Sequence, residues 1–123
     1  MDFSAALEQV KGLNFPIGEN DSGALINTDL KDINHLLVAG EGGTGKSIFV
    51  ESMILSLISK NTPDDLRLII FDNTGVDYFY NGIPHLLVPV VTDKKKMSAA
   101  LQWATLEAQK RLRAFADAGK RSV

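Results

Sequence analysis

The 123-residue sequence contains no cysteine. Disulfide bonds, thiolate zinc sites and cysteine nucleophiles are therefore excluded. Long apolar runs are also missing, since none approaches the roughly 20 residues that a membrane-spanning helix needs. The N-terminus has no basic segment followed by an apolar core, so no secretory signal is predicted. We expect a cytoplasmic chain that makes no membrane contact of its own.

Histidine is scarce as well. His35 and His85 are the two histidines, and neither has partner carboxylates at a spacing that would hold a metal ion. Hydrophobic residues make up 45% of the chain and charged residues 23%, which is ordinary for a globular protein. At this length the chain is one domain or part of one, and folding buries about two thirds of its unfolded surface.

The net charge of −2 hides an uneven distribution. Residues 1–93 hold five basic and 13 acidic side chains, a balance of −8, whereas residues 94–123 hold eight basic and two acidic ones, a balance of +6. A solvated helix face explains a basic segment of this kind. Contact with a phosphate backbone or with an acidic neighbouring subunit explains it equally well.

One motif carries specific chemistry. The pattern G-x-x-x-x-G-K-[ST], a phosphate-binding loop, occupies Gly40, Glu41, Gly42, Gly43, Thr44, Gly45, Lys46 and Ser47. The apolar run His35–Ala39 before it is typical of a buried strand, and the apolar stretch Ser47–Ser59 after it has the length of a helix. Strand, glycine loop and helix form the arrangement that this motif requires.

Each residue type in the motif has a physical role. Glycines permit backbone angles and close approaches that other residues do not, so successive N–H groups can surround the α- and β-phosphates of a nucleotide. Lys46 is expected to reach the β- and γ-phosphates, which is the catalytic role predicted for it, and the Ser47 hydroxyl is expected to bind Mg²⁺. Glu41 is unusual, because a carboxylate weakens anion binding unless it points to solvent.

The remaining chain alternates strands and helices. Residues 2–11 predict a short amphipathic helix, and residues 15–18 with 24–27 predict a small hairpin. Two nearly continuous apolar runs, Leu66–Phe71 and Leu86–Val91, favour parallel strands covered on both faces. Pro89 cannot donate a hydrogen bond to a sheet, so the second of these strands should lie at an edge or contain a bulge. The fold class predicted is α/β with a mainly parallel sheet and flanking helices.

Both long helices are expected to be buried on one side or more. The helix after the loop is apolar around most of its circumference, which predicts burial against the sheet. The last helix, capped by Thr92 or Asp93 and ended by Gly119, should contain an i,i+4 ion pair between Glu107 and Arg111. Its predicted buried stripe consists of Met97, Leu101, Ala104, Ala108, Leu112 and Phe115.

Four segments together resemble the motor domain of the FtsK/SpoIIIE family, which are hexameric, ATP-driven translocases of double-stranded DNA. They read HLLVAGEGGTGKS, SLISKNTPDDLRLIIFD, YNGIPHLLVPVVTDKKK and ALQWATLEAQKRLRAFADAGKR. The resemblance covers about residues 13–123, and the part beginning at Tyr80 is the most specific. The family residue types also recur at Trp103, Glu107, Arg111, Gly119 and Arg121. The resemblance implies a RecA-like, three-layer P-loop NTPase fold with ATP and Mg²⁺ as ligands.

The sequence departs from the family pattern in two places. Glu41 and Gly43 are unusual in the loop, which in the family reads like GATGSGKS. After the second strand Asp72 is kept, but Asn73 and Thr74 replace the usual Pro and Lys, and Asp77 replaces Glu. By pattern alone Asp72 looks like the aspartate that organises Mg²⁺. The resemblance instead assigns that role to a later strand.

The resemblance also implies that this sequence stops before that later strand and before the DNA-contacting loops, and that it lacks the family's membrane anchor. We therefore expect one partial motor domain, with residues 1–34 as a helix-and-hairpin lead-in and residues 35–123 as the nucleotide-binding core. Weak or no ATP hydrolysis by the chain alone is expected, because phosphoryl transfer needs a positioned water and charge compensation.

Three alternatives stay open at this point. The chain could be a catalytically inactive, truncated or engineered scaffold whose loop holds phosphate, sulfate or nothing. It could be a relative that acts in secretion or conjugation, with protein or single-stranded DNA as cargo. A small P-loop kinase or GTPase is the third, and the absence of a guanine-specific Asn-Lys-x-Asp motif disfavours the GTPase.

Overall fold

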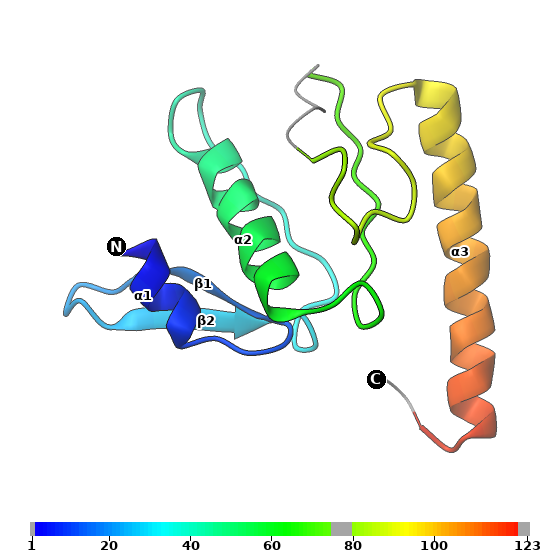
Figure 1. Cartoon of the computed structure of the whole chain (residues 1–123), viewed down its shortest axis with the longest axis horizontal. Coiled ribbons are helices and arrows are strands. Elements are labelled where there is room, and N and C mark those ends of the chain that lie inside the picture. The colour runs from blue at the N-terminus through cyan, green and yellow to red at the C-terminus, as the bar shows by residue number, and fades with distance from the viewer. Residues whose placement is uncertain (1, 75–79, 121–123) are drawn as a thin grey trace. The chain divides into compact units, whose positions relative to one another are not determined.

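The computed structural model describes residues 2–74 and 80–120. The chain forms two compact units, Met1–Leu66 and Arg67–Val123 (Figure 1). Asp77 and Arg121, two positions compared with the family pattern above, lie outside the described residues.

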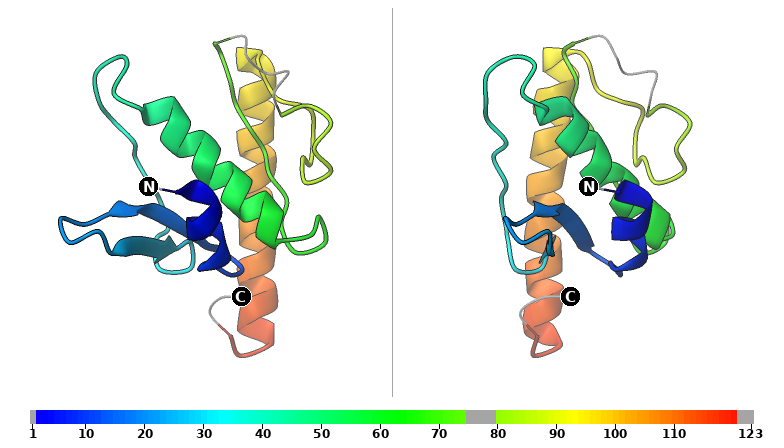
Figure 2. Two further views of the ribbon diagram at one scale, coloured as in Figure 1. Left: turned by 60° about the vertical axis from the view of Figure 1, so that its left-hand side comes forward. Right: turned by 90° about the vertical axis from the view of Figure 1, so that its left-hand side faces the viewer.

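The first unit begins with a helix that packs on a hairpin. Helix α1, Phe3–Glu8, starts where the carboxylate of Asp2 accepts hydrogen bonds from the N–H groups of Ser4 and Ala5, at 3.1 and 3.4 Å. Strands β1, Asn14–Glu19, and β2, Leu25–Asp29, pair antiparallel with an irregularity between Pro16 and Gly18. Both views of Figure 2 show α1 lying against this hairpin. The predicted helix and hairpin are confirmed, with a shorter helix than residues 2–11.

The turn of the hairpin is organised by a single side chain. The Asn20 side-chain oxygen accepts hydrogen bonds from the N–H groups of Ser22 and Ala24, at 3.1 and 2.9 Å, and from the Ser22 hydroxyl at 2.7 Å. A short polar side chain of this kind replaces backbone hydrogen bonds in turns. It thereby fixes the register of β1 against β2.

Helix α2, Lys46–Lys60, packs on β1 and completes the core of this unit. Phe15 on β1 is 0% exposed. The other buried apolar side chains of the unit are Ala6, Val10, Ile54 and Leu57. The Asn61 amide donates to the carbonyls of Leu57 and Gly12, both at 2.8 Å, and so ties the end of α2 to the segment before β1.

The predicted burial of α2 on most of its circumference is wrong. Ile54, Ser56 and Leu57 are its buried residues, whereas Ile48 is 70% exposed and Leu55 is also exposed. A two-stranded hairpin is narrow and covers one side of a helix. The remaining apolar side chains of α2 would need a wider sheet to cover them.

The segment His35–Ala39 was predicted to be a buried strand, and this is also wrong. It has no regular secondary structure, and Leu37 is 88% exposed. A buried parallel strand needs hydrogen-bonding neighbours and covering helices. Within the described part of the chain, no segment pairs with residues 35–39.

The second unit contains the beginning of a parallel sheet. Leu68 pairs with Leu86, and Phe71 pairs with Val91, as two isolated parallel bridges. At the first bridge the Leu68 N–H donates to His85 O at 2.8 Å, and the Leu87 N–H donates to Leu68 O at 2.9 Å. The parallel direction predicted for these runs is confirmed, but continuous strands are not formed.

Pro89 lies between the two bridges. Three steps along the chain separate Leu68 from Phe71, whereas five separate Leu86 from Val91, so the proline-containing side carries two extra residues. The Val90 N–H donates to the Asn81 side-chain oxygen at 3.0 Å instead of joining the ladder. The predicted bulge is confirmed, and its cause is the imide nitrogen that cannot donate.

Helix α3, Lys94–Asp117, has both predicted ends. The Asp93 carboxylate accepts from the Lys95 N–H at 2.7 Å, and the Arg111 Nε donates to Glu107 at 3.0 Å. At the C-terminus the N–H of Lys120 donates to Phe115 O and that of Gly119 to Ala116 O, with Gly119 at φ 71°. These two bonds form a Schellman motif, which ends the helix at the predicted glycine.

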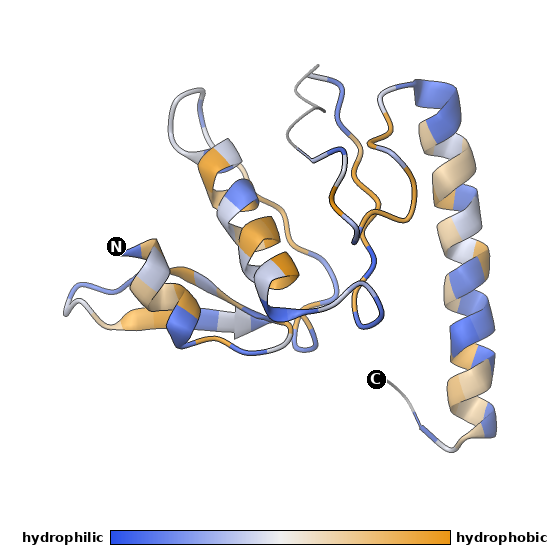
Figure 3. Ribbon diagram, in the orientation of Figure 1, coloured by the Kyte–Doolittle hydropathy of each residue, from blue (hydrophilic) through white to orange (hydrophobic). Residues whose placement is uncertain are grey.

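The buried stripe predicted for α3 is wrong. No residue of this helix is buried, and Leu112 is 62% exposed. In Figure 3 apolar and polar residues alternate along α3. The predicted stripe needs an apolar surface on its own side of the helix, and the described part of this unit does not supply one.

The architecture is therefore a small α/β arrangement whose one sheet, among the described residues, is the antiparallel pair β1–β2. The mainly parallel sheet predicted from the sequence is represented by the bridges of the second unit alone. Local signals, such as caps and turns, appear where they were predicted. Pairing between distant segments is incomplete.

Candidate functional site

The glycine loop precedes α2, at the end of this helix away from the β1–β2 hairpin (Figures 1 and 2). The opposite end of α2 is held to the hairpin side by the Asn61 bonds and by the buried Leu57. The first turn of α2 is closed by the Phe49 N–H, which donates to Gly45 O at 3.0 Å. The loop is thus presented on a helix whose other end is anchored.

Two of the loop glycines have backbone angles that favour glycine. Gly43 has φ 80° and Gly45 has φ 97°, both in the left-handed region. Gly40 is required for a different reason, because an added Cβ would lie 2.7 Å from Thr44 Oγ1. Gly42 meets neither condition. The predicted glycine backbone angles are therefore present at Gly43 and Gly45, whereas Gly40 and Gly42 do not have them.

The Lys46 ammonium group lies across the loop. Its Nζ donates to Gly40 O at 2.6 Å and to Glu41 O at 2.8 Å. These two carbonyls belong to the opposite limb of the loop, so the side chain curls back over it. A positive charge is thereby held at the loop that the motif assigns to phosphate.

Thr44 closes the loop a second time. Its hydroxyl donates to Glu41 O at 2.6 Å, and its N–H lies 3.3 Å from the same oxygen. Together with Lys46, these groups make Glu41 O the acceptor of three hydrogen bonds. The sequence motif assigns no role to the residue before the G-K pair. The signal in the sequence that identifies Thr44 is its spacing, because this hydroxyl residue lies three positions after Glu41, the second residue of the loop.

Ser47 and the Glu41 side chain remain exposed. Neither side chain hydrogen-bonds to any residue that the structure describes. A hydroxyl without a protein partner, next to a loop that carries an ammonium group, suits a role as a Mg²⁺ ligand. An exposed Glu41 carboxylate is solvated, which lowers its repulsion of an anion.

These residues fit a triphosphate with its Mg²⁺ ion. Helix α2 begins at Lys46, with the positive end of its dipole toward the loop. Lys46 supplies a cation, and Ser47 supplies a free hydroxyl oxygen. The chemistry of the set matches phosphate better than any neutral ligand.

Asp72 follows the first bridged segment of the second unit. Its side-chain oxygen accepts from the Thr74 hydroxyl at 2.5 Å and from the Thr74 N–H at 2.8 Å. These two bonds, the hydroxyl first, lower the pKa of the Asp72 carboxyl below its ordinary value. The bonds close a local turn at the end of the segment, so Asn73 and Thr74 form a self-contained structure in place of the family's Pro and Lys.

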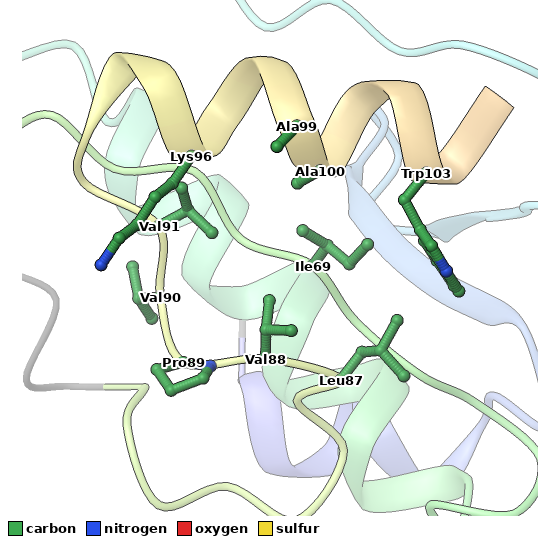
Figure 4. Close-up of a pocket in the computed structure, with 10 residues that line it drawn as sticks. All are labelled: Ile69, Leu87, Val88, Pro89, Val90, Val91, Lys96, Ala99, Ala100 and Trp103. Atoms are coloured by element: carbon green, nitrogen blue, oxygen red, sulfur yellow. The ribbon is translucent and has the colours of Figure 1, made fainter.

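An apolar pocket of about 530 Å³ lies between α3 and the bridged segments of the second unit (Figure 4). The residues that line it are Ile69, Leu87, Val88, Pro89, Val90, Val91, Lys96, Ala99, Ala100 and Trp103. Lys96 and Trp103 project from α3 at opposite ends of this view. Pro89 and its neighbours Val88 and Val90 are part of the lining.

Metal-binding clusters and membrane-spanning helices are both absent from the described residues. Those residues contain no group of three or more histidines, cysteines, aspartates or glutamates that could hold a metal ion. No helix among them is both long enough and apolar enough to cross a bilayer.

Comparison with known proteins identifies the family. The family model described as the FtsK/SpoIIIE family matches residues 5–123. The DNA translocase FtsK of Clostridium tetani is 43% identical over 114 residues, which cover 92% of this chain and 15% of that protein. The DNA translocase FtsK of Pseudomonas aeruginosa is 45% identical over 108 residues, or 87% of this chain and 13% of that protein. The chain therefore spans about one seventh of the length of these relatives.

Proposed function

Because the chain belongs to the FtsK/SpoIIIE family, we propose that it is the ATP–Mg²⁺-binding part of an ATP-driven double-stranded DNA translocase motor. The observation that carries this proposal is the Lys46 ammonium, which is held across a glycine loop by the carbonyls of Gly40 and Glu41. The backbone of the loop binds the phosphates, Lys46 turns toward the β- and γ-phosphates, and Ser47 binds Mg²⁺.

The proposed architecture is a single partial motor domain of the RecA-like, three-layer type. Residues 1–34 form the lead-in and residues 35–123 the nucleotide-binding core. The parallel bridges of Leu68 with Leu86 and of Phe71 with Val91 support this, because parallel pairing is the sheet type of that fold.

The experiment is a calorimetric titration of the chain with ATP–Mg²⁺, using Lys46→Ala and a matched control, Lys60→Ala. Lys60 lies in the last turn of the same helix. We expect Lys46→Ala to lose affinity by about 100-fold or more, since charge-assisted bonds contribute about 1.5–3 kcal/mol each. Lys60→Ala should bind like the parent chain. Equal affinity of Lys46→Ala and the parent would refute the assignment of the loop.

A thermal-shift measurement separates this proposal from an inactive scaffold. A ligand that binds the folded chain raises its melting temperature by mass action. We expect ATP–Mg²⁺ to raise it in the parent chain and not in Lys46→Ala. No shift in the parent chain would favour a scaffold that carries the motif without binding nucleotide.

Double-stranded DNA is the proposed partner, with hexameric self-association of the motor. The basic segment 94–121 supports DNA contact, because α3 has no buried residue and holds most of the basic residues of this segment. Fluorescence anisotropy with a duplex should show binding at low salt that weakens steeply as salt rises, as backbone contacts do. Absence of binding at low salt would remove DNA contact by this segment.

A further inference from the structure

We propose that Thr44 is a positioning residue that keeps the phosphate loop closed when Lys46 moves to the nucleotide. This inference rests on the proposed function of the loop. The Thr44 side chain touches neither phosphate nor metal in this proposal. It acts through the carbonyl of Glu41, which it holds with its hydroxyl at 2.6 Å.

Four hydrogen bonds cross the loop, two from Lys46 and two from Thr44. Lys46 Nζ donates to Gly40 O and Glu41 O at 2.6 and 2.8 Å. An ammonium group that reaches the β- and γ-phosphates gives up these carbonyls, at least in part. The hydroxyl and the N–H of Thr44, at 2.6 and 3.3 Å from Glu41 O, then become the bonds that keep the loop closed.

The loop also has a steric constraint. An added Cβ at Gly40 would lie 2.7 Å from Thr44 Oγ1 and 3.7 Å from its Cβ. Thr44 is β-branched and stiff at χ1, so its hydroxyl evades such a contact only by changing rotamer and leaving Glu41 O. Gly40 and Thr44 are therefore matched: the missing side chain at one position makes room for the hydroxyl of the other.

Closure of the loop also has an energetic consequence. A loop that is already closed loses less conformational freedom when it binds, and this raises affinity without any new contact with the ligand. The Thr44 hydroxyl bond is the kind of neutral hydrogen bond whose loss costs about threefold to tenfold in an equilibrium constant. The loss should appear equally for ATP–Mg²⁺ and for inorganic tripolyphosphate–Mg²⁺, because the loop holds phosphate and the base plays no part.

The test uses Thr44→Val, which keeps the shape and removes the donor, and Thr44→Ser, which keeps the donor. Thr105→Val is the matched control, because the Thr105 hydroxyl also donates to a backbone carbonyl, that of Leu101 at 2.9 Å, but on α3. We expect Thr44→Val to weaken both ligands by about threefold to tenfold, with an unchanged melting temperature. Thr44→Ser and Thr105→Val should bind like the parent chain.

Hydrogen exchange of the loop amides gives an independent readout. Thr44→Val and Gly40→Ala should both exchange faster than the parent over residues 40–46 in the absence of ligand, since both remove the hydroxyl bond to Glu41 O. Thr44→Ser should exchange at the parent rate. Slow exchange in Thr44→Val would overturn the proposal.

The two proposals fail in different ways. If the parent chain binds neither ATP–Mg²⁺ nor tripolyphosphate, the proposed function fails. If the parent binds both and Thr44→Val binds them equally well, the role of Thr44 fails and the function stands. If Thr44→Ser loses as much affinity as Thr44→Val, the role of Thr44 is also contradicted, because the hydroxyl would then be irrelevant.

Discussion

In Met1–Leu66 an antiparallel hairpin, two helices and a fully buried Phe15 share one core, whereas Arg67–Val123 holds two isolated parallel bridges and a 24-residue helix without a buried residue. The two strands of the hairpin follow each other directly in the sequence. The parallel bridges join segments that are separated by a long connection, as parallel pairing requires. The comparison teaches that the unit with local pairing buries Phe15 among its own residues, whereas the long helix of the unit with non-local pairing buries none.

The candidate site belongs to the better-packed unit. Its loop is fixed by bonds within eight residues and is presented on α2, which is anchored on β1. Order at the loop therefore does not depend on the parallel pairing of the second unit. The following predictions test this difference between the two units.

The largest expected effect breaks the first unit alone. Phe15→Ala removes a side chain that is 0% exposed, and core substitutions of this kind cost about 3–5 kcal/mol. Leu112→Ala in α3 removes a side chain of which 62% is exposed, and surface changes stay within about 0.5 kcal/mol. Chemical denaturation monitored by hydrogen exchange measures the loss of stability in each variant. Similar losses from the two variants would contradict the contrast between the units.

A smaller effect is expected inside the loop. Gly45→Ala places a side chain at φ 97°, which costs about 1–2 kcal/mol, because the left-handed region is unfavourable for residues with a Cβ. Gly42→Ala is the control, since Gly42 has no atom within 4 Å of an added Cβ and no positive φ. Thermal unfolding should separate the two variants. Equal stability would mean that the left-handed angle at position 45 is not required.

The smallest effect concerns the turn at Asp72 in the second unit. The hydrogen bonds from Thr74 lower the pKa of this carboxyl in the folded state. They therefore stabilise the turn fully at pH values above the ordinary pKa of 3.8, and this stabilisation is lost as the pH falls through the lower pKa of the folded state. In Thr74→Val the hydroxyl bond is absent, and the pKa of Asp72 should rise toward 3.8. Carboxyl chemical shifts in an NMR titration report it. An unchanged pKa would show that the hydroxyl contributes nothing.

Sequence reasoning succeeded where structure depends on neighbours in the chain. Asp93 caps α3 and Gly119 ends it, both as predicted from residue types, and the hairpin forms where it was predicted. The site residues were also found together, because a loop motif is contiguous. The role of Thr44 was missed, since it arises from the distance between its hydroxyl and Glu41 O and the motif says nothing about that distance.

Sequence reasoning failed where structure depends on distant partners. Leu37 looked like the centre of a buried strand and is almost fully exposed, because hydropathy shows what a segment can bury and not whether a partner is there. The same holds for Ile48 on α2 and Leu112 on α3. Pro89 was the exception, since its missing N–H predicts a break in pairing whatever lies beside it.

Pro89 also affects how the chain associates with other molecules. The segment LLVPVV is uncharged and rich in β-branched residues, and Leu87 and Val88 are exposed. Six-residue stretches of this composition stack readily into cross-β fibrils when no proline interrupts them. Pro89 interrupts this apolar segment, and by doing so it disfavours aggregation of the segment with the same segment of other molecules.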